Sequence, residues 1–181
     1  MSQASAAHPI LLTFDECEEG TTQLGFEIGP QEIELEDAFF SFPRPLQVDL
    51  TVHRSTELFT LNGHIRTVVC GECCRCLAGA EEPLEVEFKL LLQRRHASED
   101  ELEAVAEDEE IEIVDPGKRG MDLGDRIRDA VILELPVRIY CTTDCKGLCP
   151  QCGQDLNQEA CSCAEKEVDP RWEGLKKIQF S

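Results

Sequence analysis

The sequence predicts an α+β protein: an antiparallel β-sheet or small β-barrel-like N-terminal part, one central helix, a cysteine-rich C-terminal module and a short terminal helix. Three observations lead to this fold class. Apolar and polar residues alternate through much of residues 46–92, as in strands with one buried face. After residue 121 the apolar spacing changes to that of a helix. Six cysteines then fall between Cys141 and Cys163.

The mostly β region is predicted to cover residues 10–95, after a disordered N-terminus at residues 1–9. Alternation at Leu24, Phe26 and Ile28, and again at Ile33 and Leu35, predicts short strands, and three clearer strands follow. Short polar turns favour antiparallel pairing, with a small barrel as the alternative to an open sheet. The apolar faces of the three clearer strands are Leu46, Val48, Leu50 and Val52; Phe59, Leu61, Ile65, Thr67 and Val69; and Leu84, Val86, Phe88, Leu90 and Leu92.

Two helices are predicted in the second half of the chain. Residues 121–140 are expected to hold a helix and a connecting strand, with Asp122 as the N-cap and Pro136 ending the helix. Residues 167–181 are expected to form a C-terminal helix, because Asp169-Pro170 is a typical helix start. The apolar face of that helix would comprise Trp172, Leu175 and Ile178.

The chain is strongly acidic. Its 181 residues include 37 acidic and 17 basic side chains, which gives a formal net charge of -20. Much of the excess lies in residues 96–120, which are predicted to form an exposed acidic loop. A surface of this charge repels nucleic-acid phosphates and favours basic partners, although solubility alone also explains it.

The cysteine content and the absence of apolar runs predict a cytoplasmic protein. No run of about 18 apolar residues occurs, so no membrane partner is expected. Residues 1–9 lack the basic start and apolar stretch of a secretory signal. Eleven cysteines are an odd number for a paired disulfide scaffold, and in a reducing compartment clustered cysteines are typically ligands or free thiols.

The C-terminal cysteines predict a metal module over residues 141–166. At its centre, Cys149-Pro-Gln-Cys152-Gly has the spacing with which two thiolates bind one tetrahedral metal from a tight turn. Cys161 and Cys163 complete the primary ligand set, and Cys141 and Cys145 compete for that role. Thiolate-only ligands select structural Zn²⁺, or less favourably an iron–sulfur cluster.

A second cluster, Cys70-Gly-Glu-Cys73-Cys74-Arg-Cys76, follows the second of the clearer strands. Cys73 and Cys76 can form a second or alternative metal set with Cys141 and Cys145. The Cys70–Cys76 cluster can instead serve thiol-redox or metal-sensing chemistry, which is the alternative function, or be merely structural. The four histidines lie upstream of the C-terminal run, and no catalytic base stands out, so we expect no enzyme and no small-molecule substrate.

The chain resembles the YceD-type family of large ribosomal RNA subunit accumulation proteins. Four features carry the likeness in family order over roughly residues 40–180. The features are Cys73-Cys74-Arg75-Cys76-Leu77 after a strand containing Gly63; the helix from Asp122 to Pro136; Cys145-Lys-Gly-Leu-Cys149-Pro-Gln-Cys152-Gly-Gln-Asp-Leu-Asn157 with Cys161-Ser-Cys163; and Asp169-Pro-Arg-Trp172 with Leu175-Lys-Lys-Ile178. The third of these features is long and quite specific. Cys70 and Cys74 are additions to the family's usual paired cysteines.

The resemblance implies a non-enzymatic factor that supports accumulation or processing of 23S rRNA and assembly of the large ribosomal subunit. It also implies a mostly β N-terminal part and a cysteine-bearing C-terminal region. The implied partners are ribosomal proteins or assembly factors of the large subunit, with rRNA contacted directly or indirectly. Because the chain is so acidic, we expect it to act through a basic protein rather than by wrapping RNA.

Overall fold

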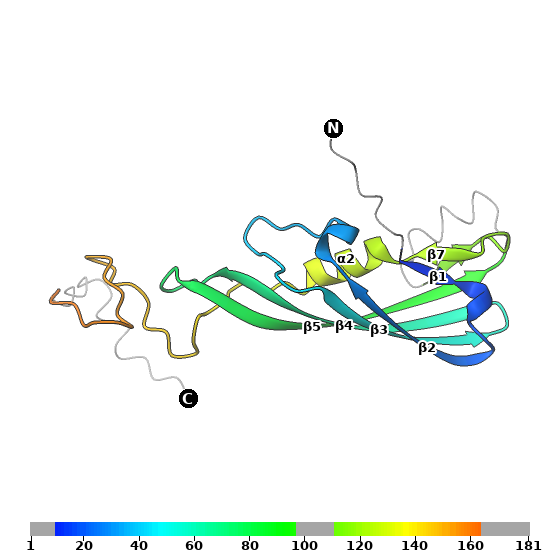
Figure 1. Cartoon of the computed structure of the whole chain (residues 1–181), viewed down its shortest axis with the longest axis horizontal. Helices are drawn as coiled ribbons and strands as arrows, with labels where there is room; N and C mark the ends of the chain where they lie inside the picture. Colours follow the sequence, from blue (N-terminus) through cyan, green and yellow to red (C-terminus); the bar gives the residue numbers. More distant parts are fainter. Residues whose placement is uncertain (1–9, 97–110, 164–181) are drawn as a thin grey trace, which may run out of the picture.

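The computed structural model describes residues 10–96 and 111–163, and its main body is a twisted β-sheet with one helix on one face (Figure 1). A long hairpin, β4 with β5, extends from this body toward the cysteine-rich segment. The elements in chain order are β1 (Leu11–Thr13), η1 (Phe14–Glu16), β2 (Gly20–Ile28), η2 (Pro30–Ile33), β3 (Leu46–Ser55), β4 (Leu58–Glu72), β5 (Gly79–Arg94), β6 (Glu112–Val114), β7 (Gly120–Asp122) and α2 (Gly124–Leu133).

The main sheet has the strand order β2-β3-β4-β5-β6. Its first four strands pair antiparallel, and the β4–β5 ladder runs from Leu58 opposite Gln93 to Glu72 opposite Gly79. β6 adds to the edge of β5 in parallel. β1 and β7 form a separate two-stranded sheet. The 15 and 16 residues of β4 and β5 make the hairpin long enough to carry its tip away from the core.

One face of the main sheet is the core, as the alternation predicts. Leu50 in β3, Ile65 in β4 and Val86 in β5 are buried and lie on this face, because β-strand side chains alternate between faces. Among their chain neighbours, Asp49 and Glu87 are exposed on the opposite face. The sheet therefore presents a wet polar face, which the described residues leave uncovered.

The N-terminal segment and α2 cover the apolar face. Ile127 and Val131 of α2 are fully buried, at the spacing of one helix face. Phe14 in η1 packs on Phe59 of β4 with ring centroids 5.1 Å apart. These contacts make a single core beneath the sheet, and this core continues to Cys73, Cys76 and Cys145 of the cysteine module.

The sheet departs from the predicted architecture in two respects. It is open in the described residues, since no pairing joins β2 to β6, so the barrel alternative is not supported. It is also mixed, because β6 runs parallel to β5, whereas antiparallel pairing was predicted throughout. Ile33 and Leu35 are buried, but η2 and an αL residue, Glu34, stand where a short strand was predicted.

The segment boundaries also differ in detail. The predicted acidic loop at 96–120 contains β6 and the start of β7, while 97–110 lie outside the described residues. No strand follows the helix within residues 134–140; β7 precedes it instead. The N-cap position is Leu123, although Asp122 accepts a hydrogen bond from the backbone N–H of Gly124. The predicted disordered start and the predicted C-terminal helix lie outside the described residues.

Candidate metal centre

The tip of the β4–β5 hairpin forms a tight cysteine knuckle. The backbone N–H of Cys73 donates to the carbonyl of Ala78, and the N–H of Leu77 donates to the carbonyl of Cys73. The N–H of Arg75 points to the sulfur of Cys73 at 3.5 Å. Cys73 and Cys76 are both buried, so the turn aims two thiols at one point.

The chain beyond α2 brings a second pair of thiols to this knuckle. The backbone N–H of Cys74 donates to the carbonyl of Ile139, which is buried, and this bond holds the incoming segment against the hairpin tip. The Sγ atoms of Cys73 and Cys145 are 3.8 Å apart, and those of Cys76 and Cys141 are 3.5 Å apart. We call these four residues the first cluster; all four sulfurs lie within 4.8 Å of one another.

The second cluster consists of Cys149, Cys152, Cys161 and Cys163, whose sulfurs also lie within 4.8 Å of one another. Its knuckle repeats the geometry of the first: the N–H of Gln151 points to the sulfur of Cys149 at 3.5 Å. The N–H of Gly153 donates to the carbonyl of Cys149, and Gly153 has a φ of 75°. A glycine is favoured there because residues with a Cβ seldom adopt that conformation.

Each cluster has the chemistry and spacing of a four-thiolate metal site. A tetrahedral ion with Zn–S bonds of about 2.3 Å places its sulfurs about 3.8 Å apart. The two sulfur separations in the first cluster, 3.8 and 3.5 Å, are close to that value. They are far longer than a disulfide bond of about 2.05 Å, and all eleven cysteines are free. Both clusters can therefore hold a metal ion.

The thiols of the first cluster differ in acidity. Burial raises the pKa of Cys73, but hydrogen bonds from the backbone N–H groups of Cys141, Arg75 and Cys76 outweigh it and lower the pKa to about 6. For Cys76 the balance is opposite. The N–H of Ala78 lowers its pKa, but burial and hydrogen bonding among the neighbouring sulfurs raise it to about 12. Neighbouring thiolates repel one another, so ionising one thiol makes ionisation of the next less favourable. A cation at the centre of the cluster would favour the ionised form of all four thiols.

The second cluster also contains one thiol with a lowered pKa and one with a raised pKa. Hydrogen bonds from the backbone N–H groups of Cys152 and Gln151 lower the pKa of Cys149 to about 6. A hydrogen bond with the thiol of Cys152, together with burial, raises the pKa of Cys163 to about 12. The first thiolate of each knuckle is thus formed readily, and it can start metal capture at neutral pH.

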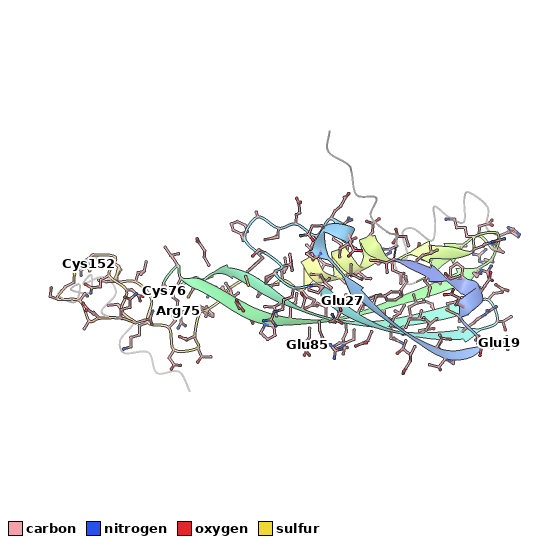
Figure 2. All side chains as sticks on the ribbon, in the orientation of Figure 1. Glu19, Glu27, Arg75, Cys76, Glu85 and Cys152 are labelled. Atoms are coloured by element: carbon pink, nitrogen blue, oxygen red, sulfur yellow. The ribbon has the colours of Figure 1, made fainter. Side chains whose placement is uncertain are left out.

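Arg75 joins the two clusters. Its guanidinium donates to the carbonyl of Cys145 at 2.8 Å and stacks on the ring of Tyr140 at 4.7 Å. The backbone carbonyl of Arg75 accepts a hydrogen bond from the N–H of Leu148, the residue that precedes the first cysteine of the second cluster. A Cβ on Gly147 would lie 3.0 Å from that carbonyl, so the approach requires a glycine. Figure 2 shows Arg75 beside Cys76, with Cys152 farther toward the same end of the molecule.

Asn157 makes a second link between the clusters. Its side-chain oxygen accepts from the N–H of Lys146 at 2.7 Å, and its amide nitrogen donates to the sulfur of Cys145 at 3.3 Å. Asp155 accepts from both the backbone and the side chain of Asn157 and fixes its orientation. Hydrogen bonds to metal-bound sulfur are the outer-shell contacts that orient ligands.

The structure brings together each of the two four-cysteine sets that the sequence analysis nominated. Cys17, Cys70 and Cys74 lie outside both sets, so only Cys73 and Cys76 of the Cys70–Cys76 run belong to a group of four sulfurs. The sequence analysis gave no role to Arg75 and Asn157. Both stand inside the cysteine motifs, at Cys74-Arg75-Cys76 and at the end of the Cys145–Asn157 stretch, which is the signal that could have found them.

Histidines take no part in either cluster among the described residues. His53 lies beside the hydroxyl of Thr21, and His64 lies 3.9 Å from Glu85, both on the polar face of the sheet. His96 pairs with Asp115. Within the described part of the chain, no helix is long and apolar enough to cross a membrane.

The fold and the clusters define a class of protein: an α+β sheet scaffold whose longest hairpin supports a cysteine-rich module able to hold metal ions. Residues 61–179, more than half of the chain, match the sequence model of the family described as large ribosomal RNA subunit accumulation protein YceD. The chain belongs to the YceD family. The matched range includes both clusters, β5 and α2.

Several curated proteins are similar to this chain. An uncharacterized protein of Mycobacterium tuberculosis is 37% identical over 130 residues, which are 72% of this chain and 60% of that protein. The chloroplastic large ribosomal RNA subunit accumulation protein YCED homolog 1 of Arabidopsis thaliana is 31% identical over 146 residues, covering 69% of this chain and 46% of that protein. The chain thus spans about 60% of the length of the mycobacterial relatives. No solved structure matches.

Proposed function

We propose that this protein is a non-enzymatic factor that supports accumulation or processing of 23S rRNA and assembly of the large ribosomal subunit. The observation that carries the proposal is the match over residues 61–179 to a family described by large ribosomal RNA subunit accumulation. The Arabidopsis and maize relatives carry the same description in their names.

We further propose that each cluster holds a structural Zn²⁺ and that the second cluster is the primary site. When bound, zinc supplies a fixed tetrahedral crosslink. Four thiolates per ion leave no open position for water, which catalytic zinc requires. The segment 141–163 contributes few side chains to the sheet core, so metal ligation supplies the folding free energy that packing does not.

The charge of the chain supports an indirect action on rRNA. A net charge of -20 opposes close approach to phosphates and favours a basic ribosomal protein or assembly factor. Such a role needs no small-molecule substrate and places the protein in the cytoplasm, where ribosomes are assembled. Filter binding of the zinc-loaded chain to 23S rRNA at low and moderate salt should show only weak retention. Tight, salt-sensitive retention would contradict indirect action.

Deletion of the gene tests the function directly. The ratio of 23S to 16S rRNA should fall, unprocessed large-subunit precursors should accumulate, and sucrose gradients should show fewer 50S particles. The wild-type chain should restore all three, and Cys70→Ser should do so equally, because Cys70 lies outside both clusters. Normal 23S rRNA and normal 50S particles in the deletion strain would refute the proposal.

A further inference from the structure

An apolar groove lies beside the first cluster, and Cys73 of that cluster forms part of its lining. Three of its side chains are unusually exposed for apolar residues: Phe39 is 83% exposed, Val137 95% and Leu77 61%. Contiguous exposed apolar side chains typically mark an interaction site. The groove is lined by Ala38, Phe39, Phe40, Glu72, Cys73, Cys74, Leu77, Pro136, Val137 and Ile139.

The first wall of the groove is held rigidly against β4. Ser41 and Cys70 exchange backbone hydrogen bonds of 2.8 and 2.9 Å. The ring of Phe40 lies so close to Gly71 that a Cβ there would be 3.0 Å from it. Asp37 accepts hydrogen bonds from the backbone N–H groups of Phe39 and Phe40. The exposed Phe39 is therefore positioned by its neighbours and does not belong to a loose loop.

The knuckle and the segment after α2 form the other walls. Leu77 has a φ of 62°, a left-handed conformation that is strained for a residue with a Cβ. Its N–H bond to the carbonyl of Cys73 ties that conformation to the first cluster. The bond from Cys74 to the carbonyl of Ile139 fixes the chain around Val137. The groove is thus preformed, and its shape depends on the first cluster.

Acidic side chains accompany the apolar lining. Glu72 is part of the lining, and Glu36, Asp37 and Glu134 lie exposed within two residues of lining residues. Two exposed basic side chains, Arg75 and Arg138, lie in the same stretches, so acidic side chains outnumber basic ones. An acidic border around an apolar centre suits a basic polypeptide with an apolar anchor, and it opposes phosphates.

We propose that this groove docks a basic segment of a large-subunit ribosomal protein, anchored by one or two apolar side chains. The proposal rests on the proposed function and names the surface through which it would act. A second copy of this chain fits poorly, because it carries the same charge of -20. The chain's own residues 164–181 hold four acidic and four basic side chains and so lack the complementary charge.

Fluorescence polarisation with the zinc-loaded full chain tests the groove. The probes are fluorescein-labelled peptides that tile the basic segments of the organism's large-subunit ribosomal proteins. At least one peptide should bind, and Phe39→Ser with Val137→Ser should weaken that binding about tenfold or more. Leu11→Ser, at an apolar residue exposed on β1, is the matched control and should change binding less than twofold. Glu72→Gln should weaken binding and reduce its salt dependence.

Absence of binding by every peptide would overturn the proposal, and so would binding that the double variant leaves unchanged. Trp172, the single tryptophan, reports on the chain's own C-terminal segment. A shift of its emission to longer wavelength in the double variant, without peptide, would assign the groove to that segment instead. A dimer in sedimentation analysis that the double variant abolishes would assign it to a second copy.

Failure of the docking proposal can be told from failure of the proposed function. If peptides bind in the groove but the deletion strain has normal 23S rRNA, the docking surface stands and the function fails. If the deletion strain lacks 23S rRNA but the double variant restores it fully and no peptide binds, the function stands and the docking surface fails.

Discussion

The side-chain amide of Asn157 donates a hydrogen bond of 3.3 Å to the sulfur of Cys145, twelve residues earlier in the chain. Cys145 belongs to the first cluster, whereas Asn157 lies between the two halves of the second. The loop of one cluster therefore helps to hold a thiol of the other. With Arg75, this contact makes the two clusters parts of one unit at the end of the hairpin.

Asn157→Ala should weaken metal binding at the first cluster about 10- to 100-fold, the usual cost of losing an outer-shell partner. Competition with a chromogenic zinc chelator measures this affinity. The second cluster should keep its affinity, so one of two metal ions per chain should become easier to remove. Gln154→Ala, in the same loop, is the control, because the side-chain amide of Gln154 donates to Glu159. Equal loss in both variants would contradict a specific role for Asn157.

Two metal ions should bind per chain. Cys149→Ser and Cys73→Ser should each remove one ion, because each substitution takes one thiolate from a different set of four. The double variant should hold none, and Cys74→Ser should keep two. Elemental analysis of the purified chains, with protein quantified by amino-acid analysis, gives the counts. A single ion in the wild-type chain, or no loss in Cys73→Ser, would show that the first cluster is not a metal site.

Metal binding and the folding of the module should weaken as pH falls. The pKa of Cys73 and that of Cys149 are lowered to about 6 in the folded chain from the usual 9.0. A thiol whose pKa is lower in the folded chain than in the unfolded chain stabilises the folded state. This contribution is fully present at pH values above about 9, and it is lost as the pH falls from about 9 through about 6. Protons also compete with metal at every thiolate.

Chelator-detected metal release should therefore be slight at pH 7.5 and nearly complete at about pH 5. Far-ultraviolet circular dichroism should show the β-sheet intact at both pH values, because the sheet core contains mainly apolar side chains. Metal that stays bound at pH 5 would contradict thiolate ligation. Loss of the sheet signal together with the metal would show that the module and the sheet fold as one unit.

Gly63→Ala should destabilise the sheet by about 1–3 kcal/mol, because a Cβ at residue 63 would lie 2.0 Å from the ring of Phe88 on β5. The ring crosses the glycine and would have to move. Urea unfolding followed by circular dichroism measures the change in free energy of unfolding. Gly25→Ala, in β2 with open space around it, should change that free energy by less than about 0.5 kcal/mol. Equal effects would rule out the ring contact as the cause.

The sequence by itself determined the local features of this protein. Alternation in β3, β4 and β5 predicted which side chains face the core, because a strand with one wet face must place its apolar residues at every second position. The two-residue spacing of Cys73 with Cys76 and of Cys149 with Cys152 indicated the knuckles, because a tight turn brings such thiols together. The family motifs also lie in local stretches of sequence.

Only the tertiary structure decided the relationships between distant segments. It selected Cys141 and Cys145 as the companions of the hairpin tip, 65 to 72 residues away, and it placed β6 parallel to β5. Spacing and periodicity carry no information about which distant segments meet, because that depends on the course of the whole chain across the sheet. The roles of Arg75 and Asn157 could not be predicted from the sequence for the same reason. Each residue contacts a cluster that forms only when the long hairpin and the chain beyond α2 come together.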